Sequence, residues 1–198
     1  MATLLTWEGT DDWRAESALV LPHAREFTAS GVQLGVAPVP YRLDYRLTTT
    51  DGWVTAAVAL TAAGAGWRRA ARLARAGDGH WSFSAETEGT VELPHPTYDQ
   101  PALAGALDCD LGFSPLTNTM PILRGDLHRR PGSAELTMAW ISVPDLAVRV
   151  SRQRYEHLRT TDGGAVVRFS SGAFTADLVV DGEGFVVDYP DLARRVGA

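Results

Sequence analysis

Apolar and polar residues alternate along much of this chain with a period of two, which is the spacing of a half-buried β-strand. The clearest run is residues 41–48, whose charged and hydroxyl side chains fall on one face. The opposite, apolar face of this run consists of Tyr41, Leu43, Tyr45 and Leu47. Asp51-Gly52 then predicts a turn, and residues 53–60 resume extended character.

The same alternation recurs in short segments that are separated by turn residues such as glycine, proline and aspartate. These further predicted strands are residues 80–84, 135–143, 148–155, 165–169, 174–180 and 185–189. Many short strands at this spacing indicate an all-β meander, barrel or sandwich.

Three segments depart from this pattern. Residues 67–75 are rich in alanine and arginine and have high helix propensity, yet a turn and a Trp-x-Phe strand follow at once. We therefore favour a strand here, because tertiary pairing often overrides propensity. Residues 93–101 contain three prolines and predict a loop within one domain, and residues 190–196 predict a single helical turn.

Composition narrows the classes of protein that fit. The 198 residues are 45% hydrophobic and 21% charged, which excludes a disordered chain and suits one large domain, residues 1–198. The formal charge of −6 argues against a nucleic-acid partner, which needs a basic surface. All 18 basic residues are arginine, so no lysine can form a Schiff base or complete a P-loop.

The N-terminal region and the longest uncharged stretch bear on localisation. Residues 1–13 lack a basic segment and a long apolar segment, so they do not predict a signal peptide. The uncharged stretch between Asp51 and Arg68 is shorter than the roughly 20 residues that a membrane-spanning helix needs. We therefore expect a cytoplasmic protein without a transmembrane segment.

Residues 108–124 are the most unusual stretch, and they begin with Asp108-Cys109-Asp110. On a strand the two aspartates point to the same side, where they could bind a divalent cation or share a proton. The alternative is a solvated strand face or carboxylates that pair with nearby arginines. The negative field of the two aspartates raises the pKa of a thiol and so opposes its reactivity. We therefore expect Cys109 to be a buried small residue and not a nucleophile.

Small hydrogen-bonding residues follow among prolines in the same stretch: Ser114, Thr117, Asn118 and Thr119. Such side chains ordinarily satisfy backbone groups in turns, but they could also contact a ligand headgroup. Arg124 could make a planar, charge-assisted contact with a phosphate or a carboxylate. The six tryptophans and five tyrosines either fill the core or line a ligand cavity.

The stretch DCDLGFSPLTNTMPILR resembles the signature of a bacterial family of putative glycolipid-binding proteins, also known as a domain of unknown function. The Thr-Asn-Thr-x-Pro-Ile run carries most of the specificity, whereas Leu116 replaces the usual aromatic residue and Leu123 the first arginine of a pair. Further segments resemble the family in order: Trp7-Glu8-Gly9, Tyr41 to Tyr45 with Trp53, Gln153-Arg154-Tyr155 and Asp188-Tyr189-Pro190. The resemblance implies a highly curved antiparallel sheet that forms a barrel or half-barrel with few short helices, as in bacterial lipid carriers.

We therefore expect a protein that binds an amphipathic lipid or glycolipid in an apolar groove of a curved sheet, without catalysis, a metal or another cofactor. The alternatives are an enzyme that uses Asp108 and Asp110, with or without a metal, on a sugar or phosphate ester, and a ligand-free scaffold for protein partners. Exposed edge strands would also allow a homodimer. The residues expected to bind the ligand are Tyr41, Tyr45, Trp67, Trp81, Trp140, Tyr155, Asp108, Asp110, Asn118, Thr119 and Arg124.

Overall fold

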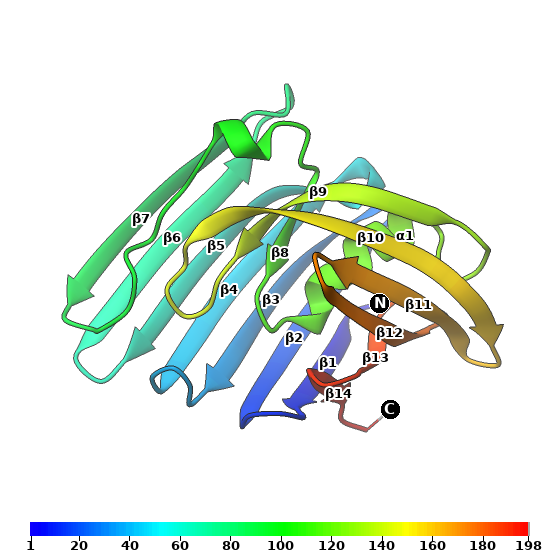
Figure 1. The fold of residues 1–198 in the computed structure, drawn as a ribbon, viewed down its shortest axis with the longest axis horizontal. Helices are drawn as coiled ribbons and strands as arrows, with labels where there is room; N and C mark the ends of the chain where they lie inside the picture. Colours follow the sequence, from blue (N-terminus) through cyan, green and yellow to red (C-terminus); the bar gives the residue numbers. More distant parts are fainter. Residues whose placement is uncertain (198) are drawn as a thin grey trace.

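The computed structural model describes residues 1–197 and arranges 14 strands in one sheet (Figure 1). The first seven strands are β1 (Thr3–Gly9), β2 (Arg14–His23), β3 (Glu26–Gly35), β4 (Tyr41–Thr50), β5 (Val54–Gly64), β6 (Trp67–Arg75) and β7 (Trp81–Gly89). The others are β8 (Asp108–Leu111), β9 (Ser133–Ile141), β10 (Val148–Thr161), β11 (Gly164–Ser171), β12 (Phe174–Asp181), β13 (Val186–Tyr189) and β14 (Ala193–Arg195).

The helices are few and short, as expected. One α-helix, α1 (Thr119–Arg124), accompanies three 3-10 helices: η1 (Asp51–Trp53), η2 (Pro101–Leu103) and η3 (Pro115–Asn118). None of the helices within residues 1–197 is both long and apolar enough to cross a membrane.

The sheet consists of a first meander, β1 to β7, and a second meander, β8 to β14, which meet where β1 pairs with β14. Its strand order is β7-β6-β5-β4-β3-β2-β1-β14-β13-β12-β11-β10-β9-β8. Every neighbouring pair is antiparallel except β8 and β9, which are parallel. The predicted β-rich fold and its curved, unclosed half-barrel form are confirmed, since the sheet bends until β8 lies against β5 (Figure 1).

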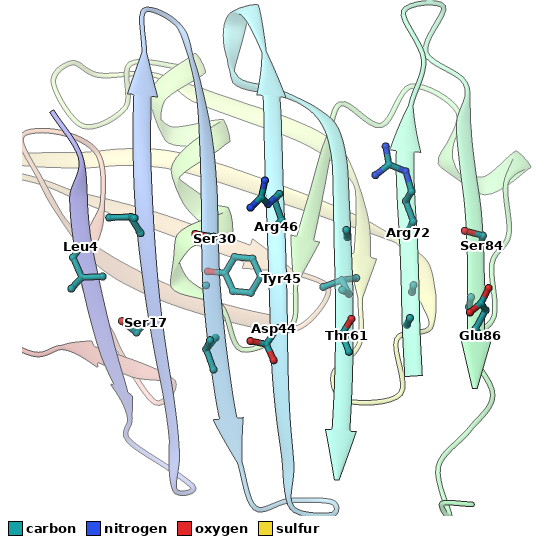
Figure 2. A pocket seen from close by; sticks show the side chains of 18 residues that line it. Leu4, Ser17, Ser30, Asp44, Tyr45, Arg46, Thr61, Arg72, Ser84 and Glu86 are labelled. Atoms are coloured by element: carbon teal, nitrogen blue, oxygen red, sulfur yellow. The ribbon is translucent and has the colours of Figure 1, made fainter. Parts of the chain in front are cut away.

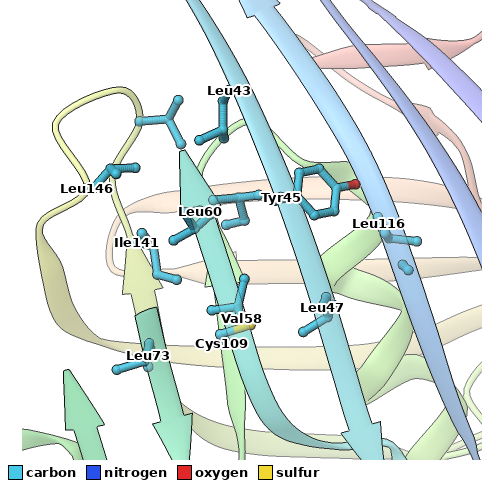
Figure 3. Close-up of a cluster of buried hydrophobic side chains, with 14 of the residues drawn as sticks. Leu43, Tyr45, Leu47, Val58, Leu60, Leu73, Cys109, Leu116, Ile141 and Leu146 are labelled. Carbon is cyan, nitrogen blue, oxygen red and sulfur yellow. The ribbon is translucent and has the colours of Figure 1, made fainter. Parts of the chain in front are cut away.

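The interior of the bend is filled with side chains. The predicted inner face of β4 is confirmed, because Tyr41, Leu43, Tyr45 and Leu47 are each at most 5% exposed. Figure 3 shows this face of β4, β5 and β6 packed against Cys109 of β8, Leu116 of η3 and Ile141 of β9. A second cluster lies between α1 and strands β10 to β13. The core therefore occupies most of the space that the curved sheet encloses.

Glycines on β3 make room for two of the tyrosines. A Cβ atom on Gly31 would lie 2.4 Å from the ring of Tyr45, and one on Gly35 would lie 2.5 Å from the ring of Tyr41. Each glycine is paired with its tyrosine across the strands β3 and β4. The aromatic rings thus cover the glycine backbone, which helps to fix the register of this part of the sheet.

Residues 67–75 form the strand β6, which confirms the favoured interpretation. Its inward face carries Trp67, Arg69, Ala71 and Leu73, so a charged side chain lies in the core. Arg69 is 1% exposed and donates hydrogen bonds to the carbonyl oxygens of Leu93, Pro94 and Asp145. This arginine therefore connects β6 to the proline-rich loop and to the turn after β9.

The predicted helical turn at residues 190–196 is wrong. Residues 193–195 form β14, which pairs with both β1 and β13. Backbone hydrogen bonds join Thr10 N to Leu192 O at 3.1 Å and Val196 N to Thr6 O at 2.8 Å. Strand pairing with a distant part of the chain satisfies these backbone groups better than one isolated helical turn would.

The variant Arg69→Lys should lower the free energy of unfolding by about 2 kcal/mol, because an ammonium group cannot reproduce the contacts of a planar guanidinium with three carbonyl oxygens. Urea denaturation measures this change. Arg72→Lys is the matched control, since Arg72 lies on the same strand but is exposed, and it should change stability by less than about 0.5 kcal/mol. Equal losses in the two variants would contradict the role assigned to Arg69.

Candidate functional site

A groove of about 500 Å³ opens between the β8–η3 segment and the strands of the second meander. It is lined by Asp110, Leu111, Gly112, Phe113, Ser114, Asn118, Trp140, Arg149, Val150, Ser151, Gln153, Phe169, Ser171, Phe174, Tyr189 and Leu192. A volume of this size is within the usual range for small-molecule sites. We refer to this space as the β10 groove, because β10 contributes four of these residues.

One wall of the β10 groove is aromatic. The ring of Phe169 lies 6.1 Å from those of Phe174 and Tyr189 and 5.2 Å from that of Tyr155, measured between centroids. Phe174 remains 45% exposed and Val150 44% exposed. Large apolar side chains that stay open to solvent next to a concavity are typical of a binding surface.

The floor of the β10 groove is polar and centres on Asp110. Gln153 Nε2 donates to one oxygen of this carboxyl group at 2.6 Å, and Thr117 Oγ1 donates to the other at 3.0 Å. Within residues 1–197 no arginine or histidine forms an ion pair with Asp110. Burial raises the pKa of Asp110 to about 6, although the hydrogen bonds from Gln153 and Thr117 oppose this increase.

Asn118 and Tyr155 extend this network behind the floor. The hydroxyl of Tyr155 lies 2.9 Å from Asn118 Oδ1 and 3.1 Å from Gln153 Oε1, so it can donate to either oxygen. Tyr155 is fully buried, whereas Asn118 lines the groove. The side-chain amide nitrogen of Asn118 donates to the carbonyl oxygens of Ser114 and Pro115, each at 3.4 Å. These hydrogen bonds from and to its neighbours fix the orientation of the Asn118 side chain.

Asp108 has a different environment from Asp110, although both lie on one side of β8. Its side chain is 0% exposed and forms a two-point ion pair with Arg124, in which Nη1 lies 2.9 Å from Oδ1. Arg124 also approaches the carbonyl oxygens of Gly52 and Trp53 at 3.5 Å. The guanidinium group is thus engaged within the protein, and the pair connects α1 to β8 beside η1.

The other expected ligand residues lie apart from the groove, with one exception. Trp140 lines it, whereas Trp67 and Trp81 lie in the core at 7% and 2% exposure. Thr119 is also fully buried. Tyr41 and Tyr45 belong to the inner face of β4, where Tyr45 donates a hydrogen bond to Glu16. The structure therefore brings together Asp110, Asn118 and Trp140 in the groove, with Tyr155 behind them.

Sequence reasoning did not select several residues that line the groove, namely Phe113, Gln153, Phe169, Phe174 and Tyr189. Gln153 could have been found, because it shares the inward face of the predicted strand 148–155 with Tyr155. Nothing in the local pattern marks Phe113, which has a positive φ of 63° in the turn after β8.

Cys109 is buried, as expected, and burial together with the charges of Asp108 and Asp110 raises the pKa of its thiol to about 12. Within residues 1–197 no three histidine, cysteine or carboxylate side chains form a group that could bind a metal ion. The oxygens of Asp108 and Asp110 contact Arg124, Thr117 and Gln153 instead.

A larger and shallower depression, of about 690 Å³, lies on the outer face of β1 to β7 (Figure 2). Charged and hydroxyl side chains line this depression, among them Asp44, Arg46, Arg72 and Glu86. Opposite charges and small residues alternate across its strands, as on an ordinary solvated sheet face. It lacks the aromatic wall of the β10 groove, and its Glu86 carboxyl group is exposed, whereas Asp110 is shielded from solvent. The β10 groove is therefore the stronger candidate site.

Comparisons with known proteins agree with the fold. The sequence model of a family described as "Putative glycolipid-binding" matches residues 4–195. A crystal structure of a DUF1089 family protein from Pseudomonas aeruginosa superimposes with a TM-score of 0.68 at 29% sequence identity, covering 94% of this chain and 93% of that one. No curated protein matches the chain.

Three of the five segments that carry the family resemblance meet in the β10 groove. Asp110, Ser114 and Asn118 come from the signature stretch, Gln153 from a second segment and Tyr189 from a third. These segments are far apart in the sequence, so only the fold brings them together.

Asp110→Asn should remove a pH-dependent part of the stability. Because the pKa of Asp110 is raised from 3.8 to about 6, the folded protein holds this proton more tightly than the unfolded chain does. This stabilisation is present below about pH 4 and is lost as the pH rises through about 6. Relative to the wild type, the free energy of unfolding of the variant should therefore rise by about 2 kcal/mol between about pH 4 and pH 7.

Urea denaturation across this pH range is the measurement. Asp177→Asn is the control, because its hydrogen-bonded partner Arg168 holds the pKa of Asp177 below its ordinary value. The contribution of Asp177 to the free energy of unfolding therefore changes with pH in the opposite direction. If Asp110→Asn and the wild type had the same pH profile of stability, Asp110 would not be the half-buried, proton-binding group described above.

Proposed function

Because this chain belongs to the Putative glycolipid-binding family, we propose that it binds an amphipathic lipid in the β10 groove and does not convert it chemically. One observation supports this proposal above all others: the groove joins an aromatic wall to a polar floor within about 500 Å³. An amphipathic molecule matches such a surface at both ends, with its chain on Phe169 and Phe174 and its headgroup near Asp110.

Hydrophobic burial is sufficient to provide useful affinity. Each buried methylene group contributes roughly 0.8 kcal/mol, so eight of them contribute about 6 kcal/mol before the costs of ordering the ligand. The partly exposed side chains of Phe174 and Val150 form an apolar surface in the groove. Binding would therefore cover apolar groups that now contact water.

The polar floor is suited to a headgroup that carries hydroxyl groups. Asp110 and Gln153 offer oxygen atoms, while Ser151 and Ser171, whose hydroxyls lie 3.1 Å apart, can both donate and accept hydrogen bonds. Arg149 is at the margin of the groove, but Arg124 is already paired with Asp108. Recognition through hydroxyl groups thus has more support than recognition of a phosphate by a pair of arginines.

We further propose that residues 1–198 act as one domain. All 14 strands belong to one sheet, and the family match extends from residue 4 to residue 195. The ligand would then contact residues of one continuous sheet and would not lie in a cleft between two independent units.

Val150→Asp should weaken the uptake of cis-parinaric acid, a fluorescent fatty acid, by at least about tenfold, because the ligand would bury an unpaired carboxylate. A fluorescence titration measures this change, and native mass spectrometry of freshly purified protein detects any lipid that is carried along. Leu21→Asp is the matched control, since Leu21 is 49% exposed on β2 and lies outside the groove.

The control should bind like the wild type. If the wild type shows neither saturable uptake nor bound lipid, the proposed function is wrong. If both variants lose binding equally, the ligand binds elsewhere than in the β10 groove.

A further inference from the structure

A small cavity lies next to the β10 groove, on the other side of Phe113. Its volume is about 10 Å³, close to that of one water-sized group. It is bounded by Trp7, Glu8, Gly9, Arg14, Ala15, Glu16, Gln33, Leu34, Tyr41, Phe113, Leu192 and Ala193. Phe113 and Leu192 line both this cavity and the groove, so they form the partition between the two spaces.

Three buried polar side chains around this cavity each have an atom without a hydrogen-bond partner within residues 1–197. These atoms are Glu16 Oε2, Gln33 Oε1 and the hydroxyl oxygen of Tyr41. The three residues are only 3%, 2% and 5% exposed. Buried polar groups in proteins are ordinarily paired, so three such atoms around one cavity point to a ligand group.

The remaining polar atoms of the cluster are already engaged. Glu16 Oε1 accepts hydrogen bonds from the hydroxyls of Tyr45 and Ser114, the latter at 2.6 Å, and Gln33 Nε2 donates to the carbonyl oxygen of Gly112 at 3.3 Å. These bonds hold the side chains of Glu16 and Gln33 in place. The positions of Glu16 Oε2 and Gln33 Oε1, which have no partner within residues 1–197, are therefore fixed.

The hydroxyl of Tyr41 and Gln33 Oε1, one a donor and the other an acceptor, can together bind the hydroxyl group of an alcohol. Burial raises the pKa of Tyr41 to about 12, so its hydroxyl stays protonated and can donate, while Gln33 Oε1 can only accept. A ligand hydroxyl both accepts and donates one hydrogen bond, which suits this pair. An anion would meet the oxygens of Glu16 and Gln33, and the neighbouring Arg14 is already paired with Asp11.

Phe113 lies between the cavity and the groove. Its backbone has a φ of 63°, its side chain is 38% exposed, and its ring lies 4.3 Å from the guanidinium carbon of Arg14. A partly exposed ring has solvent-facing space into which it can turn once its cation–π contact is broken. Rotation of the ring would join the two spaces.

We propose that the cavity behind Phe113 binds one hydroxyl group of an uncharged sugar that forms the headgroup of the lipid. This inference rests on the proposed function, because the lipid chain would occupy the β10 groove while the sugar reaches past Phe113. It specifies the headgroup class, a neutral sugar, and the residues that select it, Tyr41 and Gln33.

The test uses two competitors that displace cis-parinaric acid: n-octyl β-D-glucopyranoside, kept below its micelle-forming concentration, and octanoic acid. Tyr41→Phe removes only a hydroxyl that has no partner within the described chain, so the fold is retained. This variant should weaken the glucoside about five- to tenfold and change octanoic acid by less than about twofold. Tyr98→Phe, which removes a hydroxyl that donates to the carbonyl oxygen of Trp81, should alter neither competitor.

Each other outcome overturns a definite statement. If the wild type binds the glucoside and Tyr41→Phe binds it equally well, the sugar subsite is wrong and the lipid groove stands. If Tyr41→Phe weakens both competitors equally, Tyr41 acts on the groove as a whole and not on the headgroup. If the wild type takes up neither the fluorescent acid nor the glucoside, the proposed function fails, and this inference fails with it.

Discussion

The position of β8 between the two halves of the bent sheet is the constraint on which the other features depend. This short strand pairs with β9 on one side only. On its other side Thr55 of β5 fixes it, because Cys109 N donates to Thr55 Oγ1 at 3.0 Å and Thr55 N donates to the carbonyl oxygen of Leu107 at 3.1 Å. The side chains of β8 are thereby divided between the filled core and the second meander, where Asp110 meets Gln153.

A filled core and an open groove coexist because the two meanders have different partners. The inner face of the first meander is covered by β8, β9 and η3, so its tryptophans and tyrosines stabilise the fold by burial (Figure 3). The second meander is covered by α1 at one end, and its aromatic residues near the other end remain partly exposed. The site for a ligand is therefore at the boundary of the core and not at the centre of the bend.

Local pattern was sufficient to predict most strands but not their partners. The alternation over residues 41–48 determines which side chains of β4 are buried, because strand periodicity is a local property. The pairing of β14 with β1, the parallel contact of β8 with β9 and the inward position of Arg69 all depend on segments distant in sequence. For the same reason the shared face of Asp108 and Asp110 was predictable, whereas their separate partners, Arg124 and Gln153, were not.

The pairing of β1 with β14 places the first and last strands of the sheet side by side (Figure 1). A short peptide could join them, and the covalent chain could then be opened elsewhere, for example at the exposed turn between β10 and β11 near Gly163. Such a circular permutant would keep every strand neighbour, although β11 to β14 would leave the ribosome before β1 to β7, and β8 to β10 would leave it last. The architecture thus depends on which strands adjoin, and not on which of them is synthesised first.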